Sequence, residues 1–230
     1  MRVQETQAEI LSNFATLFSY PTEKMHINRS CEIARKNMKA INSEGEKDLE
    51  FFQNYIRKHD IGYLEESYTG IFELNPTIAP YVGYHLFGES YMRSIFLSEL
   101  KTRLELYSFD YGSELPDHIA VLLTFLSKNI SSDLAKELVN DAIRPMLNIV
   151  IWTGTDPEEK PDNPKSSNAY YYLFNSLRKF LDKLEGIAVI YPSTGNYNTV
   201  KLNVIESKST QSDGPTYIDQ WISKGENKNA

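Results

Sequence analysis

The stretch that decides the fold is Glu114–Leu126, ELPDHIAVLLTFL, in which a short polar segment with a proline leads into an apolar run. Apolar residues then recur at the i, i+3, i+4, i+7 spacing of a core-facing helical stripe: Ile119, Leu122, Leu123 and Leu126. Pro116 suits the first turn of this helix, because the amide hydrogen that proline lacks is not needed there. The stretch therefore predicts a helix that is buried on one face.

Other segments of the sequence, before and after this helix, carry apolar stripes of the same period. They are Ile10 to Phe18, ended by Tyr20-Pro21; Leu49 to Ile56; Leu64 to Phe72, ended by the prolines at 76 and 80; a long segment from about Tyr81 to Phe109, ended by Gly112; Leu134 to Val150, with a kink at Pro145; and Tyr170 to Leu184, capped by Gly186. Ser43-x-x-Glu46 fits a capping box, and Ser131-Ser132-Asp133 offers another helix cap. These patterns predict an all-α chain.

The chain has 230 residues, which is long enough for one large domain with a sizeable core. We expect an all-helical domain over residues 1–186. Within it, residues 153–168 contain three prolines and almost no apolar residue, which predicts a mobile surface loop. Residues 187–230 combine turn signals with polar sequence, which predicts an irregular or partly disordered C-terminal tail.

Composition excludes several classes of function. The net charge is −7 and the pI is about 5.2, so the chain has no basic field for nucleic acid, and a basic peptide is the favoured partner. Cys31 is the only cysteine, which leaves no internal disulfide. No run reaches the roughly 18 apolar residues of a membrane span. We therefore expect a cytoplasmic protein that does not insert into the membrane.

Motifs for catalysis or metal binding are weak. The four histidines are His26, His59, His85 and His118, and Glu-x-x-His occurs once, whereas a di-iron bundle needs two copies. There is neither a nucleophile elbow nor a phosphate-binding glycine loop. We expect no catalytic residue and no metal ligand, so the chain is not expected to be an enzyme. The alternative is a metal-binding helical enzyme that uses His85, Glu89 and His118.

Aromatic residues and prolines are concentrated between Tyr63 and Tyr91, in a region rich in turn signals. Such residues either pack a core or line a peptide groove, because rigid aromatic rings give a large contact area at a small cost in entropy. Composition alone favours packing of a core, and the peptide groove stays open as the alternative.

Three blocks of this sequence resemble the nitrate reductase molybdenum-cofactor assembly chaperones. The first is Tyr68-x-x-Ile71-Phe72-Glu73-Leu74, the second is Tyr84 to Ser90 followed by Arg93, and the third is the opening stretch with its Leu-Pro-Asp-His motif. The spacing between the blocks is similar too. Leu17 to Pro21 is similar to the end of the family's first helix.

The resemblance implies a single-domain helical bundle of the TorD-like type, without catalytic activity and without a stably bound cofactor. Such chaperones bind the N-terminal leader of an apo molybdoenzyme catalytic subunit and assist insertion of the bis-molybdopterin guanine dinucleotide cofactor before membrane targeting or export. The client implied is a nitrate reductase or a related reductase. We expect a monomer, with a dimer as the alternative. A permanent accessory subunit of the oxidoreductase complex is the competing role.

The resemblance also implies a peptide-binding groove. Its candidate residues are Tyr68, Ile71, Phe72, Pro80, Tyr81, Tyr84, Glu89, Arg93, Pro116, Asp117 and His118. Three of them have a structural alternative. Asp117 suits the cap of its own helix, His118 suits a hydrogen-bonding hinge, and Arg93 lies one turn after Glu89, with which it can form an ion pair.

Overall fold

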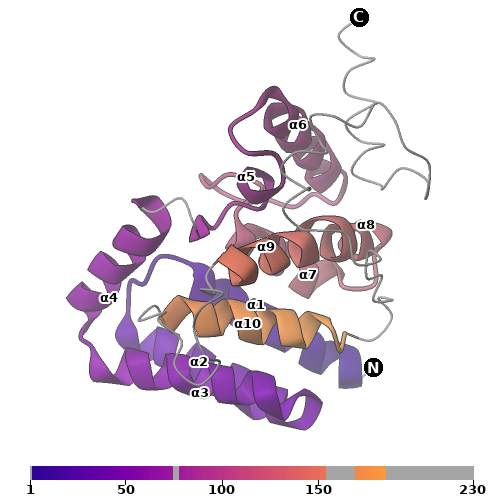
Figure 1. The fold of residues 1–230 in the computed structure, drawn as a ribbon. Coiled ribbons are helices and arrows are strands. Elements are labelled where there is room, and N and C mark those ends of the chain that lie inside the picture. Colours follow the sequence, from indigo (N-terminus) through magenta and orange to yellow (C-terminus); the bar gives the residue numbers. More distant parts are fainter. Residues whose placement is uncertain (1, 75–77, 154–168, 185–230) are drawn as a thin grey trace, which may run out of the picture.

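The computed structural model describes residues 2–74, 78–153 and 169–184 of the 230. Within these ranges every regular element is a helix, which confirms the all-α prediction (Figure 1). The elements are α1 (Arg2–Phe18), α2 (Lys24–Ile41), α3 (Ser43–Lys58), α4 (Ile61–Tyr68), the π-helix η1 (Thr69–Glu73), α5 (Val82–Phe87), α6 (Tyr91–Leu106), α7 (Ile119–Asn129), α8 (Asp133–Glu137), the π-helix η3 (Leu138–Ile143), α9 (Arg144–Thr153) and α10 (Ala169–Leu181).

The core forms where helices from the two ends of the chain meet. Helix α1 packs against α2 and α7, while α10 lies between α3 and α9 (Figure 1). The centres of the Phe18 and Phe174 rings are 4.8 Å apart, and those of the Phe14 and Phe180 rings are 6.2 Å apart. All four side chains are fully buried. The predicted stripes of α1, α7 and α10 are therefore the surfaces that meet in the core.

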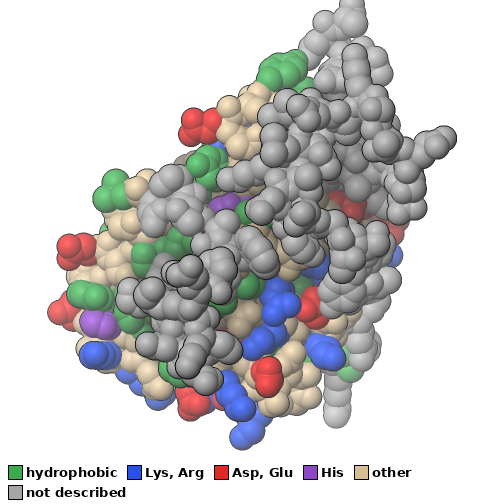
Figure 2. All heavy atoms as spheres, in the orientation of Figure 1, with side chains coloured by type: hydrophobic (Ala, Val, Ile, Leu, Met, Phe, Trp, Pro, Cys, Tyr) green, Lys and Arg blue, Asp and Glu red, His purple; other side chains and the backbone are tan. Residues whose placement is uncertain are grey.

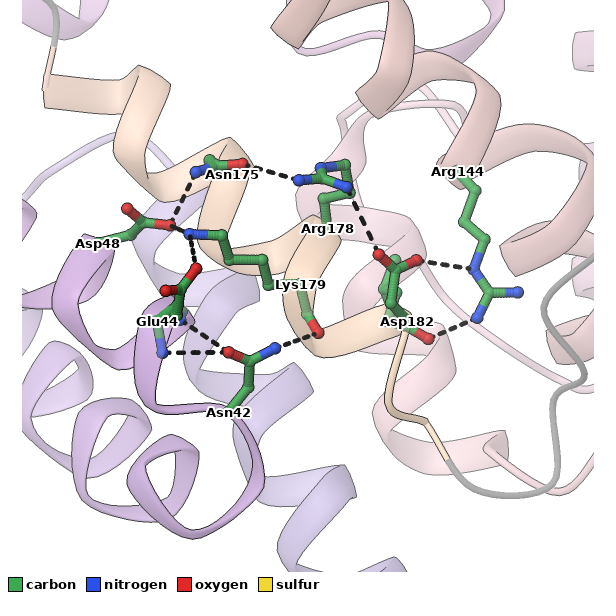
Figure 3. Close-up of polar contacts among 10 residues, drawn as sticks. Asn42, Glu44, Asp48, Arg144, Asn175, Arg178, Lys179 and Asp182 are labelled. Atoms are coloured by element: carbon green, nitrogen blue, oxygen red, sulfur yellow. Dashed lines mark hydrogen bonds and ion pairs between the residues drawn. The ribbon is translucent and has the colours of Figure 1, made fainter. Parts of the chain in front are cut away.

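Polar contacts hold α10 on its neighbours at both of its sides (Figure 3). On the α3 side, Lys179 Nζ lies 2.8 Å from Asp48 Oδ2, and Asn175 donates a 2.9 Å hydrogen bond to the same oxygen. On the α9 side, the buried Arg144 guanidinium donates to the Leu181 carbonyl and lies 3.9 Å from Asp182. These contacts fix the register of α10 in addition to its apolar stripe.

Of the two helix caps predicted from serine motifs, one is confirmed and the other is wrong. Ser132 caps α8 by accepting a hydrogen bond from the Ala135 N–H, as expected. The capping box at Ser43 is wrong. Asn42 is the N-cap residue of α3, and its side-chain oxygen accepts from the N–H groups of Glu44 and Gly45, both at 3.1 Å. Asparagine is as favourable an N-cap residue as serine. With Asn42 in this role, α3 is capped one residue earlier than predicted.

Helix α2 was not predicted from the sequence. Its core-facing residues include Ile27, Cys31, Ala34 and Met38, which follow a helical spacing but are weakly apolar or small. Burial raises the pKa of the Cys31 thiol to about 12, against the opposing effect of Arg35 and Arg57, so the thiol is protonated at neutral pH. Cys31 is therefore a packing residue.

The predicted single helix from Tyr81 to Phe109 is wrong. The chain forms two helices, α5 and α6, separated at Gly88, whose φ of 65° and ψ of −160° are rarely adopted by residues with a side chain. The second helix ends at Leu106, before Gly112. After this break α6 packs against α5, and Arg93 in its first turn reaches Asp117 just before α7.

The predicted helix from Leu134 to Val150 is interrupted rather than simply kinked. A π-helical segment, η3, separates α8 from α9, and Pro145 is the second residue after it. Proline cannot donate to the carbonyl four residues earlier, which favours a local change in hydrogen bonding. The predicted loop 153–168, apart from Thr153, the predicted domain boundary at 186 and the tail 187–230 lie outside the described residues.

Candidate functional site

Two segments far apart in sequence are joined by backbone hydrogen bonds at the start of α5. The Ile119 N–H donates to the Pro80 carbonyl at 2.8 Å, and the Val82 N–H donates to the Asp117 carbonyl at 2.9 Å. Tyr81 and His118 form an antiparallel bridge between these bonds. The aromatic and proline turn therefore lies directly against the Pro-Asp-His segment.

Asp117 connects this junction to two further elements. Its side chain is fully buried, and Oδ2 accepts hydrogen bonds from the Gly83 N–H at 3.1 Å and from Arg93 at 3.3 Å. Burial raises the pKa of Asp117, and the Arg93 guanidinium opposes that rise. The carboxylate thus occupies the N-terminus of α5. The alternative that Asp117 caps its own helix is wrong, because His118 is the N-cap residue of α7.

His118 has a defined structural role. Its Nδ1 accepts a 3.1 Å hydrogen bond from the Ala120 N–H, so this nitrogen carries no proton. The ring also meets the Tyr81 ring edge to face, with 5.3 Å between their centres. Burial lowers the pKa of His118, against the opposing effect of Glu114. The side chain therefore favours its neutral form.

Unfolding free energy is expected to fall on mild acidification because of His118. The unfolded chain has a histidine pKa of about 6.5 and binds the proton more readily than the folded chain, so stability is present above that pH and is lost as pH falls through the lowered folded pKa. Urea unfolding between pH 7.5 and 5.5 measures this loss.

The control variant is His118→Asn, which retains a capping acceptor but does not titrate. Its stability should depend less on pH across this range than that of the wild type, whatever its absolute value. Equal pH slopes for the two proteins would contradict the assignment.

Arg93 lies at the first turn of α6 with its guanidinium over two tyrosine rings. The Cζ atom is 5.6 Å from the centre of the Tyr81 ring and 5.8 Å from that of the Tyr84 ring, within the range of cation–π attraction. The ion pair predicted with Glu89 is wrong, because Arg93 pairs with Asp117 instead. Arg93 therefore contacts both tyrosine rings and stabilises their positions.

A cavity of about 750 Å³ opens in front of this arrangement. Its walls come from the end of α1, η1, the turn before α5, the start of α6, the segment before α7, and α7 itself. We call it the first cavity. Of the predicted site residues it contains eight: Tyr68, Phe72, Pro80, Tyr81, Tyr84, Glu89, Arg93 and His118.

The other three predicted residues lie elsewhere. Pro116 and Asp117 are buried and are not part of the cavity wall, and Ile71 lines a neighbouring cavity. Sequence reasoning missed Tyr20, Phe109 and Tyr111, which complete the aromatic lining. The dipeptide Tyr20-Pro21 was noted only as a helix end, although it belongs to the block similar to the family. Phe109 and Tyr111 follow α6 in a segment without a motif.

Carboxylates are prominent in the lining of the first cavity. Glu73, Glu89, Asp110 and Glu114 are all exposed and all line it. Tyr81 donates a 3.3 Å hydrogen bond to Glu114, and burial together with this carboxylate raises the pKa of Tyr81 to about 12. The cavity is therefore aromatic within and acidic at its rim, which suits an apolar ligand that carries positive charge.

Two further kinds of feature are absent from the described part of the chain. Among these residues there is no group of three or more His, Cys, Asp or Glu side chains placed to hold a metal ion. Nor does any described helix have the length and apolarity needed to cross a bilayer.

The chain was compared with protein families, curated proteins and solved structures. The family model described as nitrate reductase delta subunit matches residues 39–149. A solved structure from Archaeoglobus fulgidus, assigned as a redox enzyme maturation protein, is 26% identical, with a TM-score of 0.49 over 76% of this chain and 94% of that one. Curated proteins give no match. The matched stretch includes all three motif blocks, so this part of the chain is similar to the nitrate reductase delta subunit family.

Proposed function

We propose that this protein is a cytoplasmic maturation chaperone for the apo catalytic subunit of a molybdoenzyme, a nitrate reductase or a related reductase. It holds the N-terminal leader of that subunit in the first cavity while the bis-molybdopterin guanine dinucleotide cofactor is inserted into the client, before membrane targeting or export. One observation carries the proposal. The motif blocks of a delta-subunit sequence, distant along the chain, line one cavity of about 750 Å³.

The lining of the cavity suits a peptide. Tyr68 and Phe72 are almost fully buried behind it and form a firm apolar floor, whereas Tyr81 and Tyr84 are half-buried and present ring faces and hydroxyl groups. Tyrosine contributes contact area to apolar side chains and hydrogen bonds to a peptide backbone at low entropic cost. The cavity therefore needs little rearrangement to hold a short apolar segment.

The proposed role requires binding and release but no reaction. The buried polar groups of the site already have structural duties, because Asp117 anchors α5 and Arg93, and His118 caps α7. The groups that remain for a ligand include aromatic faces, tyrosine hydroxyls and rim carboxylates, and among the described residues Arg93 Nε has no hydrogen-bond partner. These are recognition groups, which supports a binding protein.

The test is calorimetric titration with a synthetic peptide of the N-terminus of the molybdoenzyme catalytic subunit from the same genome. We expect a 1:1 complex with a dissociation constant in the micromolar range or below, about −8 kcal/mol or better. Folding of the protein is confirmed by circular dichroism. No binding at high micromolar peptide would refute the leader-binding role.

Tyr84→Ala is expected to weaken leader binding about tenfold or more, because a half-buried aromatic wall of the cavity is removed. The matched control is Tyr91→Ala. Tyr91 is 64% exposed at the start of the neighbouring helix and does not line the cavity. The control should bind like the wild type. Equal losses in the two variants would show that the effect is not specific to the cavity.

A further inference from the structure

A second cavity, of about 690 Å³, lies on the other side of the α4–η1 helix from the first. It is formed by that helix together with Tyr20. Its lining consists of Tyr20, Gly62, Tyr63, Glu65, Glu66, Ser67, Thr69, Gly70, Ile71 and Leu74. Of the residues predicted for the groove, Ile71 is found here.

Tyr20 makes the two cavities neighbours, because it lines both. Its ring meets the Tyr68 ring edge to face, with 5.4 Å between their centres, and Tyr68 in turn lines the first cavity. The helix that separates the cavities ends in the π-helix η1, a geometry that is rare and frequent at functional sites. A chain leaving the first cavity over Tyr20 therefore reaches the second directly.

Large apolar side chains are exposed at the second cavity. Tyr20 is 46% exposed, Tyr63 47% and Leu74 77%. Gly70 adds open space, because a Cβ atom built on it would meet no atom within 4 Å. Apolar groups gathered around a concave surface are typical of an interaction site.

The charge of the second cavity matches that of the first. Glu65 and Glu66 line it, and the described residues of its lining include no lysine, arginine or histidine. Figure 2 shows acidic and apolar side chains next to one another over α4, at the left edge of the molecule. Both cavities thus favour an occupant that combines apolar and positively charged residues.

We infer that the second cavity binds the continuation of the client segment held in the first, so that one leader lies across Tyr20 with both cavities occupied. The inference rests on the proposed function. Tyr20 lines both cavities, so one peptide can pass from the first to the second. Both linings are acidic and apolar, so both suit a peptide with basic and apolar residues. The occupant has apolar residues for Tyr63 and Leu74, and lysine or arginine for Glu65 and Glu66.

The test uses peptides of two lengths. Peptides of about 12 residues are taken in turn along the leader, and the one whose affinity falls in Tyr84→Ala marks the first cavity. A peptide of about 24 residues extends it, since each added residue spans up to about 3.5 Å. We expect the long peptide to bind the wild type about tenfold more tightly.

Gly70→Trp adds a large ring to the lining of the second cavity, at a position where the added Cβ atom meets no other atom within 4 Å. This variant should weaken binding of the long peptide about tenfold and leave binding of the short peptide unchanged. Ala40→Trp, at an exposed position of α2 outside both cavities, is the matched control for the added indole ring. A second probe is Glu66→Lys, which changes an exposed side chain and should weaken the long peptide several-fold at low salt.

The outcomes separate this inference from the proposed function. If no peptide binds the wild type, the proposed function itself fails. If the short peptide binds but the long one gains nothing, and Gly70→Trp has no effect, only the second cavity is refuted. Concentration-dependent sedimentation that Gly70→Trp abolishes would assign the second cavity to another copy of this chain, which also overturns the inference.

Discussion

Asp117→Ala is expected to lower the free energy of unfolding by about 3 kcal/mol, measured by urea denaturation at pH 7. The substitution removes the oxygen that accepts from the Gly83 N–H at 3.1 Å and from Arg93 at 3.3 Å. The Gly83 N–H and the Arg93 guanidinium both lose this partner in largely buried surroundings. Removing one member of a buried ion pair costs more free energy than the intact pair contributes, because the remaining charge is left unpaired.

Asp117→Asn is the comparison that isolates the charge. It keeps the shape and one accepting oxygen, so the Gly83 bond can persist while the attraction to Arg93 is lost. We expect about half the loss seen for alanine. If Asp117→Ala were less stable than the wild type by under about 1 kcal/mol, Asp117 would not organise the junction.

Gly83→Ala is expected to destabilise the fold by about 2 to 3 kcal/mol, by overpacking. A Cβ atom at this position would lie 2.9 Å from Asp117 Oδ2 and 2.9 Å from a ring carbon of Phe96, both in fully buried side chains. Neither neighbour is free to move. The carboxylate is held by Arg93, and the Phe96 ring is part of the core. Thermal and urea unfolding of the variant measure the loss.

Gly70→Ala is the matched control for Gly83→Ala, because it is also a glycine in a helical segment but with open space around it. Alanine favours helical structure over glycine, so this variant should gain about 0.5 kcal/mol or remain unchanged. A similar loss at both positions would mean that backbone effects, and not the contacts of Gly83, decide the result.

These two positions explain how a binding wall is built from structural residues. Asp117 and Gly83 do not line the first cavity, yet their contact holds α5 against the segment before α7. Arg93, fixed by Asp117, in turn lies over Tyr81 and Tyr84. A wall held in this way keeps its shape when empty, which reduces the entropic cost of binding.

Sequence periodicity located most of the helices but not their interruptions. The stripe from Ile119 to Leu126 and the stripe of α1 are buried as predicted. The break at Gly88 was missed because Tyr84, Phe87 and Met92 continue an apolar pattern across it. Helix α2 was missed because Cys31, Ala34 and Met38 give a weak apolar signal, although they are fully buried. Periodicity reports which side of a helix is apolar and says little about where it ends.

The sequence by itself determined the all-α class, the main apolar faces and the motif blocks, because these depend on residues a few positions apart. Only the tertiary structure decided the duties of the residues within the blocks. Asp117 meets Gly83 across 34 positions and Arg93 across 24, and no local pattern specifies such partners. The same holds for Tyr20, which reaches both cavities because α1 ends beside α4. Burial and long-range pairing fix these roles, and both exist only once the helices have packed.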